Sequence, residues 1–423
     1  MSFQQGLSGL NSASKSLDVI GNNISNAGTI GFKGAQAQFA DVYAASLSGG
    51  GTAQIGIGQK LAAAAQQFSQ GNISPTNNPL DMAINGAGFF RMSQGGAITF
   101  SRNGQFQLDK NGYLVNNSGL HLTGYDADAS GKIIPTNPVE LQFTASKQSL
   151  PPVATTKLAT GLNLDARAKE PVSSPFDINN PLTFNNSTSA TVYDTLGNSH
   201  VFSTYFVKTA IAGEWDVHAT LDGVLEEPAG TPVVTLGTTT LTFNSAGALT
   251  TAMPISVSLD LNAVATALGT TNAATSPLAF NLDYTGSSQY GANFGVNTLT
   301  QDGFAAGNLA GFNVSSDGTI QGRYTNGQSK NLGQVVMADF ANSQGLQALG
   351  NNQWAQSPES GQPLMGTGGT GKFGVLQSAA VEESNVDLTG ELVNMITAQR
   401  IYQANAQTIK TQDQVLQTLV NLR

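Results

Sequence analysis

The chain has 423 residues, of which 40% are hydrophobic and only 11% are charged, and its formal net charge is −9. This length predicts two or three domains rather than a single core. The acidic balance argues against a nucleic-acid partner, and the absence of cysteine excludes disulfides, thiolate zinc sites and cysteine nucleophiles. With so few charges, the polar surface must consist largely of Asn, Gln, Ser, Thr and Gly. Such a surface can lie against copies of itself without burying many ions.

The N-terminal segment, MSFQQGLSGLNSASKSLDVI, lacks the basic region and apolar run of a secretory signal, and its first charged residue is Lys15. No stretch of the chain approaches the roughly 20 apolar residues of a membrane span, so we expect no membrane insertion. Taken alone, these features predict a cytoplasmic protein.

An apolar heptad stripe near the N-terminus predicts a long helix. Its positions alternate in steps of four and three, and two of them are weak: Phe3, Leu7, Leu10, Ser14, Leu17, Gly21 and Ile24. Each glycine inside a helix costs about 1 kcal/mol relative to alanine, and Gly6 and Gly9 also interrupt this one. The helix must therefore gain its stability by packing against another element.

Short alternating runs between residues 98 and 125 predict a series of β-hairpins. Three dipeptides separate these runs where type I′ turns require positive φ: Asn103-Gly104, Asn111-Gly112 and Ser118-Gly119. A similar pattern recurs at 312–336, around Asp317-Gly318 and Asn326-Gly327. The two halves of this predicted β-domain are therefore far apart in the sequence.

Residues 146–296 have a different composition. Prolines cluster near the start, and Thr-rich alternating stretches such as TPVVTLGTTTLTF follow. Roughly 150 residues is the size of one domain. The pattern predicts a second β-domain inserted into the first, with a short helix near 261–268.

Two loops resemble ligand-binding motifs. Residues 366–373, GTGGTGKF, match a phosphate-binding P-loop up to Lys372, but Phe373 stands where a Ser or Thr would hold magnesium, and we interpret the segment as a flexible linker. Residues 126–131, DADASG, open like a calcium loop. The twelfth position, however, is Asn137 instead of a bidentate Glu, so a surface turn is favoured.

The three histidines, His121, His200 and His218, share no metal-ligand spacing, and the chain contains no G-x-S-x-G motif. We therefore expect no enzyme activity, no catalytic residue, no cofactor and no metal.

A second heptad pattern near the C-terminus predicts another long helix. Its main positions recur every seven residues: Leu388, Met395, Tyr402, Ile409 and Leu416. Its companion positions are only partly apolar: Leu392, Gln399, Ala406, Asp413 and Val420. Two interpretations remain open for the two ends. They form a helix pair within one chain, or they become ordered only on assembly with other subunits.

We thus predict a mainly β protein with α-helical termini, in which nested discontinuous β-domains are joined to a coiled-coil-like terminal helix pair. The predicted regions are 1–33 with 378–423 as a helical assembly core, 34–72 with 360–377 as connectors, 73–145 with 297–359 as a middle β-domain, and 146–296 as an outer β-domain. The predicted self-assembly residues are Leu7, Leu10, Leu17, Ile24, Leu388, Leu392, Met395, Tyr402, Ile409 and Leu416.

Both ends of the chain resemble known signatures. Residues 17–33, LDVIGNNISNAGTIGFK, resemble the N-terminal signature shared by flagellar rod, hook and hook–filament junction proteins. Residues 384–423 are similar to the C-terminal signature of the same axial protein family. Within that family, the large insertion after residue 145 resembles the hook subunits, because the rod proteins are shorter. Phrases such as TVYDTLGNSH and GQVVMADFANSQGL extend the resemblance to nearly the whole chain.

The resemblance implies a structural subunit that polymerises with itself into a curved helical tube, which acts as a universal joint between rod and filament. It implies export by the flagellar type III apparatus without a cleaved signal peptide, and an extracellular place in the hook, attached to the basal body. The implied partners are the distal rod protein, the hook–filament junction protein, the hook capping protein and the hook-length control protein. In the resembled proteins the terminal helices form the inner layer of the tube.

Two other functions are weighed beside this one. A distal rod protein with an unusual insertion would build straight structures, whereas a hook is supercoiled. A secreted β-rich adhesin or carbohydrate-binding module would need a receptor site in the outer domain, and it would leave the paired heptad ends without a purpose.

Overall fold

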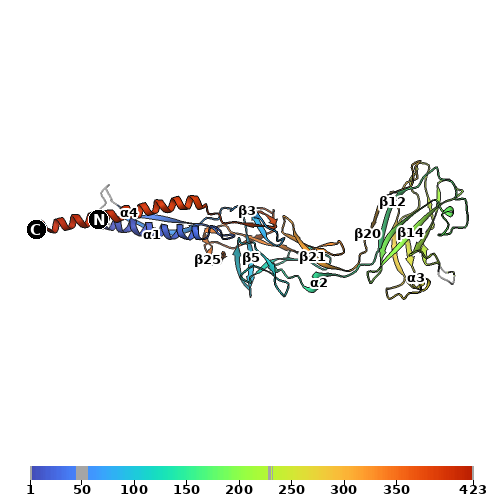
Figure 1. The fold of residues 1–423 in the computed structure, drawn as a ribbon, viewed down its shortest axis with the longest axis horizontal. Helices are drawn as coiled ribbons and strands as arrows, with labels where there is room; N and C mark the ends of the chain where they lie inside the picture. Colours follow the sequence, from blue (N-terminus) through green and yellow to red (C-terminus); the bar gives the residue numbers. More distant parts are fainter. Residues whose placement is uncertain (1, 44–55, 227–229, 231, 422–423) are drawn as a thin grey trace. The chain divides into compact units, whose positions relative to one another are not determined.

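The structure is a computed structural model that describes residues 2–43, 56–226, 230 and 232–421. It is mainly β with one long helix at each end of the chain, which confirms the predicted fold class (Figure 1). Parts of three predicted regions lie outside the described residues, namely 1, 44–55, 227–229, 231 and 422–423.

The chain divides into two compact units. Unit 1 comprises Met1–Lys147, Ala310–Arg323 and Ser329–Arg423, and unit 2 comprises Gln148–Leu309 and Tyr324–Gln328. Unit 2 is thus inserted into the sequence of unit 1, and the four-region division predicted from sequence stays a prediction.

Unit 1 begins and ends with helices α1 (Ser2–Ser25) and α4 (Leu388–Asn421). Its first group of strands is β1 (Ala35–Tyr43), β2 (Gly56–Gln66), β3 (Ile73–Pro75), β4 (Met82–Asn85), β5 (Phe89–Gln94), β6 (Ala97–Ser101), β7 (Gln107–Leu108), β8 (Leu114–Val115), β9 (His121–Asp126) and β10 (Val139–Glu140), followed by the helical turn α2 (Ala145–Gln148). Its second group is β21 (Gly307–Val314), whose first residues belong to unit 2, β22 (Thr319–Tyr324), β23 (Ser329–Val335), β24 (Met337–Asp339), η2 (Ser343–Gly345), β25 (Gln347–Gly350), β26 (Gln353–Ala355), β27 (Leu364–Gly366), β28 (Val375–Ser378) and β29 (Ala380–Glu382).

The main sheet of unit 1 combines strands from both halves of its sequence, in the order β21-β22-β23-β9-β5-β6-β26-β25. Of the three predicted turns in 98–125, two form hairpins, β7–β8 and β8–β9, with Gly112 and Gly119 at positive φ. The expected turn at Asn103-Gly104 is not a hairpin, because β6 pairs with β5 and β26 instead. The space beside Gly104 is already filled, since a Cβ there would meet the carbonyl oxygen of Met82.

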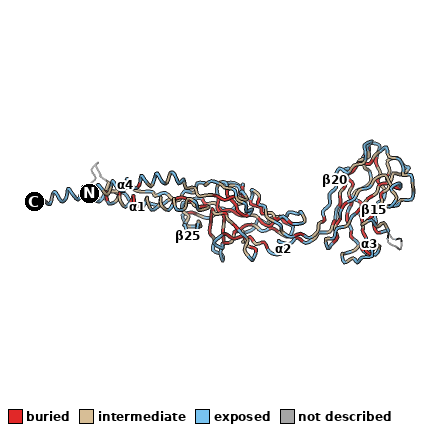
Figure 2. The backbone as a smooth tube through the Cα atoms, viewed as in Figure 1, coloured by how far each residue is buried: buried red, intermediate tan, exposed pale blue. Residues whose placement is uncertain are grey.

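Aromatic side chains fill part of the core of unit 1. Phe89 and Phe100 lie buried on β5 and β6, beside Phe340 and Trp354 from the second half of the sequence. Their rings meet edge to face, with centroids 4.8 Å apart for Phe100 and Phe340. This geometry suits the quadrupoles of aromatic rings. The same interior appears as the buried part of the sheet region in Figure 2.

Residues 34–72, predicted as a connector, contain the antiparallel hairpin β1–β2. The hairpin is fastened to α1 by hydrogen bonds, because the Gln5 amide donates to the Gly56 carbonyl at 2.7 Å and the Gln59 N–H donates to Ser8 Oγ at 2.8 Å. This hairpin therefore belongs with the terminal helices.

Two short sheets join the beginning of unit 1 to its end. Strand β4 pairs with β28, and β3 pairs with β29, both antiparallel. Residues 378–387, predicted within the helical core, hence include strand structure, and α4 starts only at Leu388. Asp387 caps this start, since its Oδ1 accepts the Thr389 N–H at 3.0 Å.

Unit 2 contains two sheets that share one core. The four-stranded sheet has the order β13-β14-β15-β17 and the five-stranded sheet has the order β16-β18-β19-β12-β20. The elements of this unit are β11 (Ser149–Leu150), β12 (Lys157–Asn163), η1 (Pro181–Thr183), β13 (Asn186–Tyr193), β14 (Ser199–Lys208), β15 (Glu214–Leu221), β16 (Val234–Leu236), β17 (Thr240–Thr242), β18 (Ile255–Leu259), α3 (Leu261–Leu268), β19 (Leu278–Asp283) and β20 (Gly295–Gln301).

The core of unit 2 is formed by side chains that alternate along its strands. Phe202 and Phe206 of β14 meet Phe280 and Tyr284 from the other sheet, and Trp215 of β15 is fully buried among them. The expected short helix is confirmed as α3. Its start and end carry ordinary capping signals, an Asp side chain before the first turn and a left-handed Gly after the last.

Candidate functional site

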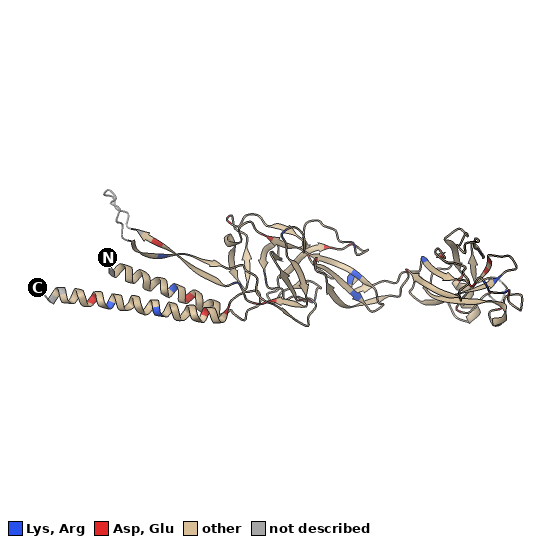
Figure 3. Cartoon of the chain, turned by 90° about the horizontal axis from the view of Figure 1, so that it is seen from above, with Lys and Arg blue, Asp and Glu red and all other residues tan. Residues whose placement is uncertain are grey.

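The two ends of the chain form an antiparallel helix pair within unit 1 (Figures 1 and 3). Gly6 and Gly9, near the start of α1, lie against Ile409 and Asn405 in the second half of α4. At the other end of the pair, Asn23 of α1 bonds to the first turn of α4. The structure thus contains the intramolecular pair that the first interpretation of the sequence describes.

Small side chains form the contacting face of α1. Gly6, Gly9, Ser12 and Ala13 are buried there, whereas the larger apolar residues of the same helix are not. A Cβ on Gly9 would lie only 2.5 Å from Asn405 Oδ1, so the two backbones approach closely at this point. Among the described side chains of α4, Ala398 is the one that is buried.

The predicted self-assembly residues therefore do not form the seam inside the pair. Half of them are exposed: Leu7, Leu388, Leu392, Tyr402 and Leu416. The other half are only partly buried: Leu10, Leu17, Ile24, Met395 and Ile409. Because small residues allow closer approach, the helices meet along them and turn the large apolar residues outward.

On α4 the predicted companion positions are shifted by one residue from the observed ones. The partly or fully buried positions of the heptad are Glu391, Met395, Ala398, Asn405, Ile409 and Gln412. The expected companions from Leu392 to Val420 are exposed except for Ala406. The seam inside the chain is therefore not defined by apolar character alone, since two of its partly buried companions are Glu391 and Asn405.

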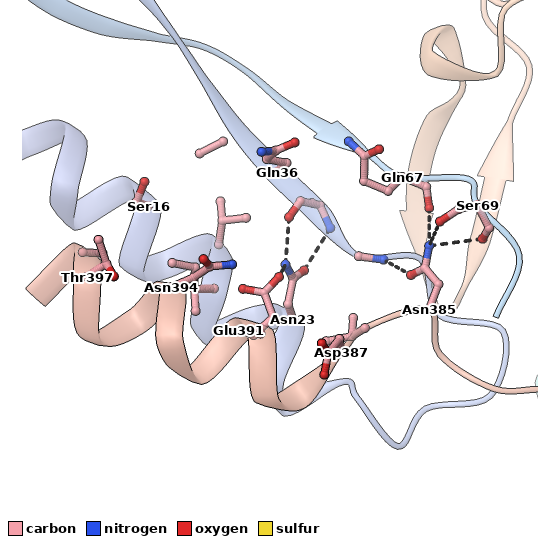
Figure 4. Close-up of a pocket in the computed structure, with 18 of the residues that line it drawn as sticks. Ser16, Asn23, Gln36, Gln67, Ser69, Asn385, Asp387, Glu391, Asn394 and Thr397 are labelled. Carbon is pink, nitrogen blue, oxygen red and sulfur yellow. Dashed lines mark hydrogen bonds between the residues drawn. The ribbon is translucent and has the colours of Figure 1, made fainter. Parts of the chain in front are cut away.

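A polar network fixes the root of the helix pair, where both helices meet β1 (Figure 4). The Asn23 amide donates to the carbonyl of Ala35 at 2.8 Å and to Glu391 Oε1 at 3.0 Å, and its Oδ1 accepts the Ala35 N–H at 2.9 Å. Asn385 accepts the Gly34 N–H at 2.8 Å and donates to the Gln67 carbonyl at 2.6 Å. Two Asn side chains therefore hold segments that are more than three hundred residues apart in sequence.

Beside this network lies an open groove of about 520 Å³ between α1, α4 and β1. Its lining mixes apolar and polar side chains, several of which are labelled in Figure 4. The apolar residues in the lining are Val19, Ile20, Ala35, Ala37, Val386, Ala398 and Ile401. The acidic residues are Asp387 and Glu391.

A buried charged triad lies beneath the root. Glu382 of β29 accepts Lys33 Nζ at 2.6 Å and Arg102 Nη1 at 3.2 Å, and its side chain is fully buried. It also accepts the Gly71 N–H at 2.9 Å. Burial lowers the pKa of both Lys33 and Arg102, although the Glu382 carboxylate acts in the opposite direction.

Sequence reasoning missed these polar positions. Asn23, Asn385 and Glu382 all fall inside the quoted terminal signatures or directly beside them, but none carries a spacing typical of a site. The one feature of the sequence that could have indicated the buried ion pair is the low charge content of the chain. Where charges are few, Lys33 and Glu382 flanking the two terminal helices are good candidates for a pair.

The loops that resemble ligand sites have structural explanations. Residues 367–373 form a hydrogen-bonded turn between β27 and β28, and Phe373 packs beside Gly366. That the segment is a flexible linker stays a prediction. In the DADASG loop, Asp128 Oδ1 accepts the N–H groups of Ser130 and Lys132, which makes the predicted surface turn.

Within the described part of the chain, no three His, Asp or Glu side chains are grouped so as to hold a metal ion. None of the helices described here has the length and apolarity needed to cross a membrane.

Four family models match this chain. They are the flagella basal body rod protein model at residues 3–33, the flagellar hook protein FlgE/F/G D1 domain at 83–148, the flagellar basal body protein FlaE D2 domain at 163–304, and the flagellar basal body rod FlgEFG protein C-terminal model at 377–422. The matches include both terminal helices and parts of both units.

Several proteins that this chain matches over its whole length are named flagellar hook protein FlgE. The chain is 43% identical over 427 residues to the flagellar hook protein FlgE of Salmonella typhimurium and to that of Escherichia coli, covering all of each. It is 30% identical to the flagellar hook protein FlgE of Borreliella burgdorferi, covering 99% of that protein. The crystal structure of Helicobacter pylori flagellar hook protein FlgE2 matches 72% of this chain with a TM-score of 0.48 and 15% identity.

Proposed function

This chain belongs to the flagellar hook protein family, and we propose that it joins copies of itself into the hook through the exposed surface of the α1/α4 pair. As a member of that family, it is a structural subunit of the bacterial flagellar hook. The proposal concerns which residues make the polymer and how they do so.

The observation that carries the proposal is the apolar surface that α4 leaves exposed. The exposed large hydrophobic residues of this helix are Leu388, Leu392, Val393, Ile396, Ile401, Tyr402, Val415, Leu416 and Val420. A soluble single subunit seldom exposes so many large apolar side chains along one helix unless a partner covers them. Neighbouring subunits would cover these side chains, and each Å² of apolar area buried would stabilise the assembly by roughly 25 cal/mol.

A hook is a helical tube, and helical assemblies arise when subunits join by head-to-tail contacts that do not close into a ring. The contact between subunits is therefore head-to-tail and open. The tube is curved and acts as a universal joint that transmits torque from rod to filament. Charged side chains are sparse along the chain (Figure 3). Surfaces made of Asn, Thr and Gln would slide past one another during bending, since few ion pairs would fix one register.

Further parts of the proposal concern the cellular setting. The subunit has no catalytic activity of its own and leaves the cell through the flagellar export apparatus without losing an N-terminal segment. Outside the cell it contacts the distal rod protein, the junction protein, the capping protein and the length-control protein. Of the self-assembly residues named from sequence, the exposed ones face neighbouring subunits: Leu7, Leu388, Leu392, Tyr402 and Leu416.

The test uses a strain that lacks this gene, complemented with Leu392→Asp or with the matched control Gln399→Asp. Both positions are exposed on α4, but only Leu392 offers apolar surface. We expect Leu392→Asp to abolish hooks and motility while the secreted subunit keeps its β-structure, and Gln399→Asp to leave hooks intact. Normal hooks built from the Leu392→Asp subunit would refute the proposal.

Electron micrographs of the same strains separate the hook from the rod alternative. Curved structures at the base of the filament are expected with the wild-type gene, whereas straight structures would favour a rod subunit.

A further inference from the structure

We propose that the C-terminal end of α4 in one subunit seats in the groove between α1, α4 and β1 of the next. This inference rests on the proposed function, because it names the occupant of one surface of the assembling helix pair. We call residues 413–421 the tail and the cavity lined by Asn23, Glu391 and Ile401 the root groove.

The tail has no helix beside it. Gly6 of α1 lies against Ile409, and beyond Gln412 the described side chains of α4 are exposed. Figures 1 and 3 show α4 continuing past the N-terminal end of α1. The exposed fractions are 54% for Leu416 and 74% for Val420, which lie one helical turn apart on the same face.

The root groove is the complementary feature. It holds about 520 Å³, and polar side chains line it together with apolar ones from three segments, including Val19, Val386 and Ile401. Along α4 the groove runs from Asp387 to Ile401, or about 21 Å at the helical rise, whereas the tail spans about 13 Å. The groove is therefore long enough to receive the tail.

The two features lie at opposite ends of one antiparallel helix pair. A chain cannot bend its own tail back into its own root groove without breaking the contacts of Gly6 and Gly9 with α4. The occupant must then be a second copy. Such a contact uses different surfaces on the two partners, so each subunit offers a free tail and a free groove to the next, and the chain of contacts stays open.

Charge is compatible with this arrangement. The groove contains the carboxylates of Asp387 and Glu391, and Lys410 precedes the tail on an exposed position. The one acidic side chain of the tail, Asp413, already accepts the Gln417 amide at 3.0 Å. An incoming tail hence brings the ammonium group of Lys410 toward the carboxylates of the groove. The carboxylate of Asp413 comes with it, already bonded to Gln417.

Cysteine crosslinking tests the contact directly, because the chain has no cysteine of its own. In hooks isolated from bacteria that produce only the Asn394→Cys/Leu416→Cys subunit, mild oxidation should give a ladder of covalent multimers. The matched control is Gln399→Cys/Leu416→Cys, since Gln399 is exposed on the same helix but does not line the groove. Either single variant and the control pair should give at most dimers, and a Thr397→Cys/Leu416→Cys pair should repeat the ladder.

A second measurement concerns strength. Leu416→Ala should raise the subunit concentration needed for polymerisation roughly tenfold, which corresponds to about 1.4 kcal/mol. The matched change Gln407→Ala, at an exposed position of α4 outside both the tail and the root groove, should leave it within about twofold.

The outcomes separate this inference from the proposed function. Hooks that form normally but show no ladder with either groove pair, or the same ladder with the control pair, would overturn the tail-in-groove contact alone. A wild-type protein that builds no hook would overturn the proposed function instead.

Discussion

The side-chain amide of Asn23 on α1 donates a hydrogen bond to Oε1 of Glu391 on α4 at 3.0 Å, although 368 residues separate the two in sequence. The same side chain bonds both backbone groups of Ala35 on β1. One buried residue thus connects the first helix, the hairpin and the last helix.

The first prediction follows from this relationship. Asn23→Ala leaves the partly buried polar groups of Ala35 and Glu391 without their partner, and each unsatisfied group costs up to about 1–3 kcal/mol. Amide hydrogen exchange in residues 2–25 should accelerate, while that of 89–126 stays unchanged. Asn11→Ala on the exposed side of α1 is the control. Equal exchange in both variants would show that Asn23 does not hold the root.

The second prediction compares two glycines of α1. Gly9 faces Asn405 closely, whereas a Cβ on Gly21 would meet nothing within 4 Å. Gly9→Leu should separate the helices and lower the helical signal in circular dichroism. Gly21→Ala should instead stabilise α1 by up to about 1 kcal/mol, the difference in helix propensity. If the two substitutions had the same effect, the close approach at Gly9 would not be important.

The third prediction concerns the order of the two ends in the isolated subunit. Since α4 exposes most of its apolar residues and α1 contacts it through small ones, the helix pair buries little surface. Elements with few buried contacts open at low free energy. Amides of 2–25 and 388–421 should exchange more than tenfold faster in the monomer than those of 89–126, and they should become protected in the hook. Strong protection in a dilute monomer would contradict this.

Much of the fold could be predicted from such patterns, but the packing of the ends could not. Heptads and turn dipeptides located both long helices, α3 and two of three hairpins in 98–125. They could not show that Gly104 lies against Met82, because that contact joins the loop after β6 to strand β4, which does not neighbour it in sequence. On α4 the companion positions expected from the heptad pattern lie one residue after the positions that are partly or fully buried within the chain. Apolar periodicity cannot distinguish a helix face that packs within the chain from a face that is exposed to other subunits.

The fourth prediction concerns the buried triad. Glu382→Gln removes the anion that bonds both Lys33 and Arg102 and leaves two buried cations, which repel each other. Breaking a buried ion pair costs about 3–5 kcal/mol. Urea unfolding of the full chain should show unit 1 destabilised by this order, with the unit 2 transition unmoved. Glu383→Gln is the control, since Glu383 bonds only Ser74 and Asn72 at the surface. Similar unfolding of both variants would exclude a stabilising triad.

The fifth prediction concerns pH and unit 2. His200 lies between Asp222, at 2.7 Å from its Nδ1, and Asp194, at 3.6 Å from its Nε2. The hydrogen bond with Asp222 raises the pKa of His200 above its ordinary value despite partial burial. Burial acts to raise the pKa of Asp222, but hydrogen bonds from His200 and the Val201 amide outweigh it and lower that pKa.

The sign of the pH effect follows from these directions. A raised histidine pKa stabilises the fold fully below about pH 6.5, and this stabilisation is lost as pH rises through the raised value. The melting temperature of unit 2 should therefore fall between pH 6.5 and 8.5, and His200→Gln should flatten this fall. His218→Gln should not, because burial lowers the pKa of His218 and gives the opposite pH dependence. An unchanged slope in His200→Gln would exclude the ion pairs.

The pairing of β3 with β29 and of β4 with β28 has a consequence for the order in which the molecule folds. A chain that emerges with its N-terminus first delivers β3 and β4 long before their partners. Unit 2, nearly continuous from Gln148 to Leu309, can complete its two sheets while unit 1 still waits for its closing strands. A chain that stopped before Val375 would thus contain a folded unit 2 and an incomplete unit 1. Its strands β3 and β4 would lack their partners, and their edges could pair with other chains.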